Sequence, residues 1–277
     1  MITQVPRILF RLGLVGLLAA AAPAAELKHD LYFCVNVSGQ GSVMGSRVAS
    51  ASGLYRSTDR EKLEHVGFNN FRTFGLTHDP RNPAVLLETV IDGAQRSTDR
   101  GKSWRRTTGW DMTEPKGVAF DPHAPDDVYL ALPDGIAVSH DGGQTWRRAH
   151  AGIKRAYTHA IVVDRTKKGR VVAGTELGIY ITEDGAQTWK LVQPTAKVTY
   201  SLAQSPHDPR VFLAATSADG ALISRDGART WTRLAGVPTA HTLHYARFDP
   251  HEAKRLVVCG WDAGVLVSED GGATWTD

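Results

Sequence analysis

Short apolar runs alternate with turn-forming residues along most of this chain. Residues 117–149 hold four such runs, Gly117–Phe120, Val128–Leu132, Ile136–Ser139 and Trp146–Ala149. Pro, Asp and Gly separate them, as in the stretch Pro133-Asp134-Gly135. Apolar runs of this length between turn residues are typical of β-strands. The pattern predicts a four-stranded antiparallel meander, whose strands we call A to D in chain order.

An eight-residue pattern recurs between the predicted C and D strands. Its clearest copy is Ser139–Trp146, and six copies begin at residues 57, 97, 139, 182, 224 and 268, so neighbouring copies lie 40 to 44 positions apart. In a tight turn, Ser or Thr and Asp can accept main-chain N–H groups, and Gly permits a positive φ. The closing Trp offers a large ring to pack between sheets. This period, with short strands between, is typical of a propeller or a solenoid.

The recurring pattern identifies two sets of residues with an expected structural role. The first copy keeps Ser57 and Asp59 but lacks the Gly and the Trp. The acidic positions are Asp59, Asp99, Asp141, Asp184, Asp226 and Asp270, and the closing aromatic positions are Trp104, Trp146, Trp189, Trp231 and Trp275.

The same frame can be extended back to the start of the array. It makes Leu31–Val37 the A strand of the first unit, Ser42–Ala49 its B strand and Leu54–Ser57 its C strand. The array then ends in a short D strand at residues 275–277. Six units fit, so we expect one domain over residues 26–277.

The Ser-x-Asp-x-Gly-x-Thr-Trp pattern resembles the Asp box, or BNR repeat, of the sialidase-like superfamily of β-propellers. Asp-Pro turns before the B strands, such as Asp79-Pro80, are similar to those of its secreted members. These include photosystem II assembly-factor-like proteins, Vps10-type receptor domains and some glycosidases. Over residues 31–277 the resemblance implies an all-β fold, a six-bladed β-propeller of four-stranded antiparallel blades with an Asp box at each C–D turn. Function varies widely on this scaffold, so the resemblance implies the fold more sharply than an activity.

The N-terminal 25 residues have a different composition from the repeats. Arg7 and Arg11 precede the apolar run Leu12–Ala22, which is followed by small residues up to Ala25. This order predicts a cleaved signal peptide over residues 1–25 and a periplasmic or secreted protein. An uncleaved anchor is the alternative, although the run is short for a membrane span. No later stretch is apolar enough to cross a bilayer, so we expect no stable membrane insertion after cleavage.

Charge and cysteine content narrow the classes of partner. Removing residues 1–24, which contain two Arg and no acid, lowers the formal charge from +3 to +1. A nearly neutral chain without a basic stripe argues against nucleic acid as a partner. No spacing of Cys, His or acids predicts a metal site, and no motif predicts a cofactor.

The two cysteines, Cys34 and Cys259, fall in the first and last units. In the frame above, Cys34 stands at one position of the A strands and Cys259 at one position of the B strands. Most of the residues that hold these two positions in the other units, which we call a column, are small. Small side chains at equivalent positions indicate that neighbouring sheets approach closely there. One prediction is therefore a Cys34–Cys259 disulfide that joins the two ends of the ring. Two separate thiols are the alternative, because stacked sheets lie about 10 Å apart.

Candidate binding residues lie on the face opposite the recurring turns. In a meander, the B–C and D–A loops share this face, and here they vary from unit to unit. Aromatic rings with a few charged groups suit a carbohydrate or a peptide. Alternatively, these residues are turn formers, loop anchors or the lining of a central channel. The candidates are Trp110, Trp261, Asp262, Arg72, Glu114, His159, Glu176, Tyr200 and His244.

Two functions remain open from these residues. The preferred one is a secreted binding or assembly scaffold for a protein or an extracellular glycan. The alternative is a glycoside hydrolase that uses carboxylates of the same face, for example Asp92 with Glu114 or Glu176 with Asp219. A sialidase is disfavoured because only Arg72 and Arg247 fall on predicted inner strands, too few for the expected arginine cluster. A deep funnel with two carboxyl groups about 5–10 Å apart would indicate the enzyme, and an open face the binder.

Overall fold

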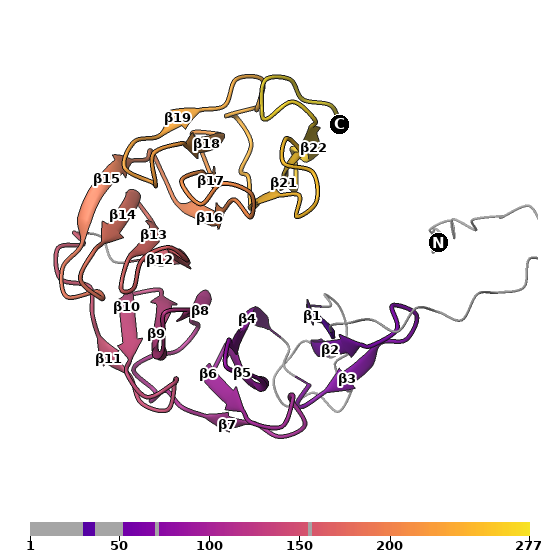
Figure 1. The fold of residues 1–277 in the computed structure, drawn as a ribbon, viewed down its shortest axis with the longest axis vertical. Helices are drawn as coiled ribbons and strands as arrows, with labels where there is room; N and C mark the ends of the chain where they lie inside the picture. Colours follow the sequence, from indigo (N-terminus) through magenta and orange to yellow (C-terminus); the bar gives the residue numbers. More distant parts are fainter. Residues whose placement is uncertain (1–29, 37–51, 70–71, 155–156) are drawn as a thin grey trace, which may run out of the picture.

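The computed structural model describes residues 30–36, 52–69, 72–154 and 157–277, and they form an all-β propeller. Six antiparallel sheets, the blades, follow one another around a central axis (Figure 1). The predicted fold class is therefore confirmed. Blades two to five have four strands each, and blades one and six have three strands each among the described residues.

The strands follow the repeat in chain order. Blade one contains β1 (Leu31–Val35), β2 (Gly53–Ser57) and β3 (Glu64–Val66). Blade two contains β4 (Thr73–Asp79), β5 (Asn82–Val90), β6 (Gly93–Ser97) and β7 (Arg105–Arg106). Blade three contains β8 (Gly117–Asp121), β9 (Ala124–Leu132), β10 (Gly135–Ser139) and β11 (Arg147–Arg148). Blade four contains β12 (Thr158–Val163), β13 (Val171–Thr175), β14 (Gly178–Thr182) and β15 (Lys190–Pro194). Blade five contains β16 (Thr199–Gln204), β17 (Phe212–Thr216), β18 (Ala221–Ser224) and β19 (Thr232–Arg233). Blade six contains β20 (Tyr245–Phe248), β21 (Leu256–Gly260) and β22 (Gly264–Ser268).

The core lies between neighbouring blades. Every residue of β13 and β17 is buried, because both faces of these B strands are covered by other sheets. Strands buried on both faces are apolar throughout rather than alternating, as the run Val128–Leu132 in β9 shows. Each blade thus buries its apolar surface only against its neighbours in the array.

The recurring turn is held by hydrogen bonds within its own eight residues. The Ser139 hydroxyl donates to Asp141 Oδ1 at 2.7 Å and accepts the Gly143 N–H at 2.8 Å. Thr145 donates its N–H to Asp141 Oδ1 at 2.9 Å and its hydroxyl to Oδ2 at 2.6 Å. Partial burial alone would raise the pKa of Asp141, but the bonds from Thr145 and Ser139 outweigh it and lower the pKa to about 2. Gly142 and Gly143 have φ of 70° and 83°, which explains the Gly of the pattern.

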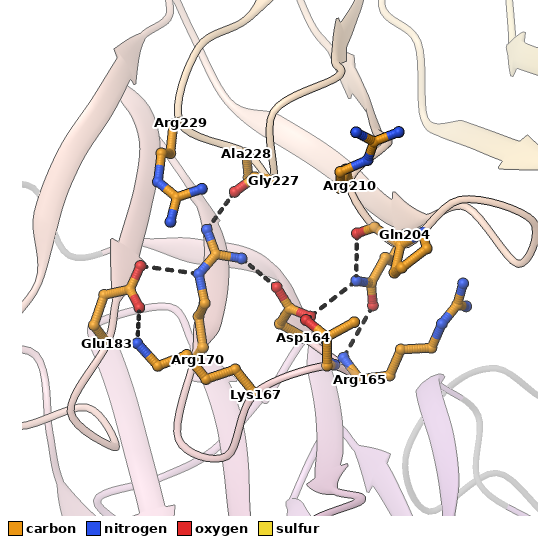
Figure 2. Close-up of polar contacts among 12 residues, drawn as sticks. Asp164, Arg165, Lys167, Arg170, Glu183, Gln204, Arg210, Gly227, Ala228 and Arg229 are labelled. Atoms are coloured by element: carbon orange, nitrogen blue, oxygen red, sulfur yellow. Dashed lines mark hydrogen bonds and ion pairs between the residues drawn. The ribbon is translucent and has the colours of Figure 1, made fainter.

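A buried ion pair joins blades four and five on the face of these turns (Figure 2). The Arg170 guanidinium contacts the Asp164 carboxylate and donates to the Gly227 carbonyl, which belongs to the turn of blade five. Its Nε donates to Glu183 Oε1 at 2.9 Å. Gln204 of blade five donates to Asp164 Oδ1 at 3.0 Å, so Asp164 also bridges the two blades. The side chains of Arg170 and Asp164 are each only 4% exposed.

The predicted A strand of blade one is wrong, whereas the predicted C strand Leu54–Ser57 lies within β2. Leu31–Val37 was expected to be an A strand, but β1 pairs directly with β2, placing Leu31 opposite Ser57 and Cys34 opposite Leu54. Val128 of β9 lies opposite Ser139 in the same way, so β1 occupies the position of a B strand. The error arose because a short apolar run is the same for an A and a B strand, and only its pairing distinguishes them. The predicted strand Ser42–Ala49 and the predicted signal peptide 1–25 lie outside the described residues.

In the part of the chain that the structure describes, the two ends of the array do not close on each other. Figure 1 shows an opening between blade six and blade one. Both cysteines are free, so the predicted Cys34–Cys259 disulfide is not formed in this structure. Cys34 and Cys259 hold equivalent positions in two B strands, opposite Leu54 and Val265, rather than one in an A and one in a B strand. Within the described ranges, no helix is long and apolar enough to cross a bilayer.

Candidate functional site

Five rings form a continuous row across blades four to six, which we call the aromatic row. It consists of Tyr157, His159, Tyr200, His244 and Trp261. The ring centroids of His159 and Tyr200 lie 4.6 Å apart in an edge-on arrangement. Those of Tyr200 and His244 lie 5.1 Å apart, and His244 stacks on Trp261 at 5.1 Å. The row therefore offers a contiguous π surface built from three blades.

The repeat explains why these side chains meet. His159, Tyr200 and His244 each precede the same A-strand position, and successive A strands are neighbours around the axis. A register shift occurs between Thr158 and Ala160 in β12 and between Thr199 and Ser201 in β16, so the residue between them is the extra residue of a β-bulge. Bulges re-aim a side chain out of the regular pleat, which here presents His159 and Tyr200 to each other.

In blades two and three, the position equivalent to His159, Tyr200 and His244 holds side chains of a different chemical type. Phe74 occupies it in blade two, at another register shift, and Lys116 in blade three. The Lys116 ammonium lies 4.0 Å from the Phe74 ring centroid and 3.0 Å from Glu114 Oε2. The aromatic face and the carboxylate both offset the positive charge of the Lys116 ammonium. Lys116 therefore adds little free positive charge to the site.

A cavity of about 680 Å³ opens beside the aromatic row. It is bounded by the inner strands of blades two to six and by the uncovered face of blade six. Its charged or titratable lining residues are Lys116, His159, Tyr200, His244, Tyr245, Arg247 and Cys259. Among the described residues that line it, none is Asp or Glu. The cavity has the volume of a small-ligand or peptide-segment site but lacks an acid pair.

Two residues of the row, His159 and Tyr157, are held in their uncharged forms. His159 Nδ1 lies 3.1 Å from the Tyr200 carbonyl oxygen, to which it must donate its hydrogen. Burial lowers the pKa of His159 to about 4, and the nearby Lys116 and His244 act in the same direction. The imidazole is therefore uncharged at neutral pH, with Nε2 as an acceptor. Burial also raises the pKa of Tyr157, so its hydroxyl remains a donor.

The structure brings together some of the predicted site residues and separates others. His159, Tyr200, His244 and Trp261 line the cavity, and Glu114 lies beside it through its bond to Lys116. Trp110 is elsewhere, 76% exposed, with the Arg106 guanidinium 4.3 Å from its ring centroid. Arg72, Asp262 and Glu176 do not line the cavity either, and neither do Asp92 and Asp219.

Sequence reasoning missed part of the lining. Tyr245 and Val265 are each 56% exposed and border the cavity. The residues equivalent to Tyr245 in blades four and five, Ala160 and Ser201, are buried, and so are Ile136 and Ile179, which are equivalent to Val265 in blades three and four. Arg247 also lines it and donates to Ser201 Oγ at 2.5 Å. Their accessibility results from the opening next to blade six, which no local sequence pattern signals.

Comparison with known proteins gives the fold but no family. No protein-family model matches the chain, and no curated protein matches it either. A GH74 enzyme from Niastella koreensis is similar in structure, with a TM-score of 0.67 and 20% identity over 82% of this chain and 42% of that one. The GH74 xyloglucanase from Xanthomonas campestris has a TM-score of 0.67 and 19% identity over 83% and 42%. YCF48 bound to a D1 peptide has a TM-score of 0.57 and 14% identity over 83% and 75%. This chain spans less than half the length of those GH74 proteins.

Proposed function

We propose that this chain is an exported binding or assembly propeller that receives a protein segment or an extracellular glycan at the aromatic row. The observation that carries the proposal is the row itself, aromatic rings in contact at the border of a cavity whose described lining contains no carboxyl group. Stacked rings with few polar groups are typical of sites that hold sugar faces or apolar peptide side chains. The signal-type N-terminus supports export.

Hydrolysis of a glycosidic bond has no comparable support. Retaining and inverting glycosidases need two carboxyl groups about 5–10 Å apart at the scissile bond. The predicted pairs, Asp92 with Glu114 and Glu176 with Asp219, do not line the cavity. Likeness to GH74 enzymes at 19–20% identity concerns the fold, on which many functions occur. We therefore favour binding over catalysis.

The proposal is tested with variants of aromatic residues inside and outside the row. The wild-type protein, a Tyr200→Ala/Trp261→Ala double variant and a Trp110→Ala control are used as baits for a native periplasmic extract, and each is also applied to an array of extracellular glycans that includes xyloglucan oligosaccharides. We expect a stoichiometric ligand that the wild type and the control retain and the double variant loses by at least about tenfold, since each stacking contact contributes about 0.5–1.5 kcal/mol.

Three results would contradict the proposal. A ligand bound equally by all three proteins would place the site away from the row. A ligand lost only with Trp110 would place it between blades two and three. Turnover of a chromogenic glycoside that survives in the double variant would establish an enzyme with its site elsewhere.

A further inference from the structure

A cavity of about 430 Å³ lies between blades four and five on the face of the recurring turns. We call it the arginine pocket, because its lining is mainly cationic. The cations are Lys167, Arg170, Arg210, Arg225 and Arg229, and the acids are Asp164 and Asp226. Asp164 directly follows β12, whereas His159 stands near the start of this strand. The arginine pocket and the aromatic row therefore lie at opposite ends of the blades.

Two of the five cations are not paired with a carboxylate, namely Arg225 and Arg229. Arg225 Nη2 donates to the Gly271 carbonyl at 3.4 Å, and Arg229 Nη1 donates to the Asp226 carbonyl at 3.0 Å. Among the described residues, no carboxylate forms an ion pair with either guanidinium. Outside the described ranges the chain has a single acid, Glu26, so nearly all of its acids are accounted for.

The guanidinium groups of Arg170 and Arg229 face the same small space, although they come from different blades (Figure 2). Gly227, in the turn of blade five, has no side chain to fill this space. The position that a Cβ of Gly227 would take lies 3.4 Å from Arg229 Nη1 and 3.6 Å from Arg170 Nη2. Three of the five N–H groups of Arg170 have partners in the buried ion pair and the Gly227 carbonyl. Two N–H groups of Arg170 thus remain for a ligand beside Arg229.

The repeat shows that the turn itself does not need a cation at Arg229. This residue is the sixth of its eight-residue turn, and the sixth residues in blades three and four are Gln144 and Gln187. Each Gln side chain donates to the carbonyl oxygen of the Asp in its own turn, at 2.8 and 3.0 Å, as Arg229 does at 3.0 Å. Because a neutral amide makes the same bond, the charge of Arg229 is free for another purpose.

The second residue of the turn also differs in blade five. Glu183 of blade four and Glu269 of blade six occupy this position, and each accepts a hydrogen bond at 2.9 Å from an Arg that directly precedes the B strand. In blade five the second residue is Arg225, and Val211 directly precedes β17. The sign of the charge is therefore reversed there, and the residue that would pair with it is apolar.

We propose that the arginine pocket binds an oxyanion of the phosphate or sulfate type, held by Arg170 and Arg229 and attracted by the charge of Arg225. Guanidinium groups donate paired hydrogen bonds to oxyanions, and an anion between two of them also offsets their mutual repulsion. Donors from two blades approach from different sides, which suits a group with three or four acceptor oxygens better than a planar carboxylate. The proposal does not depend on a ligand at the aromatic row.

The binding experiment uses inorganic phosphate and sulfate as probes, with acetate at the same ionic strength as the reference. Isothermal titration calorimetry compares the wild type with an Arg225→Thr/Arg229→Gln variant, whose new residues occur at the same turn positions in blades two, three and four. We expect the variant to lose at least about tenfold in affinity for phosphate and sulfate, because hydrogen bonds between charged groups are the strong ones. The wild type should bind acetate at least about fivefold more weakly than phosphate.

The matched control is a Lys62→Gln/Lys102→Gln variant. It removes two cations from the sixth position of the turns in blades one and two, so its net charge changes by the same amount. We expect it to bind phosphate as the wild type does. Phosphate should also raise the melting temperature of the wild type and the control but not that of the arginine variant, since a ligand of the folded state stabilises it. The melting curves without ligand establish that all three proteins are folded.

A polymer distinguishes the two sources of the anion. Dextran sulfate carries the group on a polysaccharide, and uncharged dextran is its reference. Binding at least about tenfold tighter per sulfate group than that of inorganic sulfate would assign the pocket to a glycan-borne anion, and equal binding would assign it to a free one. In both cases the arginine variant loses the binding.

Each remaining outcome overturns the proposal. Equal affinity of all three proteins for phosphate would mean ion binding outside the pocket. An equal loss in the lysine variant would mean that net charge, and not the pocket, decides the affinity. Acetate bound as tightly as phosphate would mean that the pocket does not select a tetrahedral anion. No binding of phosphate, sulfate or dextran sulfate to the wild type would mean that the arginines are solvated surface charges.

Discussion

At the scale of single residues, the buried carboxyl group of Glu88 is the clearest departure from the repeat. Its side chain is 1% exposed in β5, Gln95 Nε2 donates to its Oε2 at 2.5 Å, and its Oε1 has no partner among the described residues. Leu130 and Ala173 hold the equivalent places in blades three and four. Burial raises the pKa of Glu88 to about 7, and no sequence pattern could predict this, because the other repeats place apolar side chains there.

We predict that this group makes stability fall with rising pH. Unfolded Glu88 ionises near its ordinary pKa of 4.5, whereas the folded protein keeps it protonated up to about pH 7. Stability is therefore greatest below pH 4.5 as far as this group is concerned, and is lost between about pH 4.5 and 7. Glu88→Gln should stabilise the protein by about 3 kcal/mol at pH 8, on the order of 1.4 kcal/mol for each pKa unit, and have little effect at pH 4. Urea unfolding of both proteins at the two pH values measures this, and an equal effect at both would contradict it.

Two arginines occupy a backbone conformation that suits glycine. Arg60 and Arg100 have φ of 65° and 62° at the turn position where the later blades have Gly. We predict that Arg100→Gly stabilises the protein by about 0.5–1 kcal/mol, because the left-handed conformation costs a residue with a Cβ about 1–2 kcal/mol and Gly loses part of this gain in unfolded-chain entropy. Lys102→Gly is the matched control, since it removes a cation from the same turn where φ is not positive. It should bring no gain, and a gain from both changes would point to charge rather than conformation.

At the scale of the strands, periodicity predicted blades two to six well and blade one poorly. The expected strands Val128–Leu132 and Ile136–Ser139 lie within β9 and β10. A repeat fixes strand positions when a recurring turn lies at a constant distance on each side. Before Ser57 there is no such turn, and the run Leu31–Val35 could be an A or a B strand until its partner was known.

The ion pair between blades four and five gives a prediction at this scale. Arg170→Ala would leave the buried Asp164 carboxylate without its cation, and we expect a loss of about 3–5 kcal/mol in the free energy of unfolding. Arg210→Ala is the control, since Arg210 is paired with Asp208 at 2.9 Å but has a side chain 76% exposed, and its loss should cost less than about 1 kcal/mol. Chemical denaturation measures both, and equal losses would mean that burial does not decide the strength of the pair.

At the scale of the whole molecule, the sequence predicted the contacts that each repeat makes with the next repeat. It did not predict the exposed side chains that border the opening between blades six and one. The column of His159, Tyr200 and His244 could be anticipated because each unit places one residue there. The exposure of Tyr245, Val265 and Phe33 could not, because it depends on what stands next to blades six and one. The predicted site also included Trp110, whose loop is as variable as the others, but Trp110 does not line the cavity.

The opening between blades six and one also has a mechanical consequence. In a closed ring, every small rotation between neighbouring blades must be cancelled elsewhere, which makes the ring stiff. In the described part of this chain, the opening separates blades six and one, and small rotations at the five successive junctions of the six blades can then add up along the array. We therefore expect the separation of the two end blades to vary more than the distance between any two neighbouring blades. Each junction can remain as tightly packed as a closed core while the width of the opening still varies.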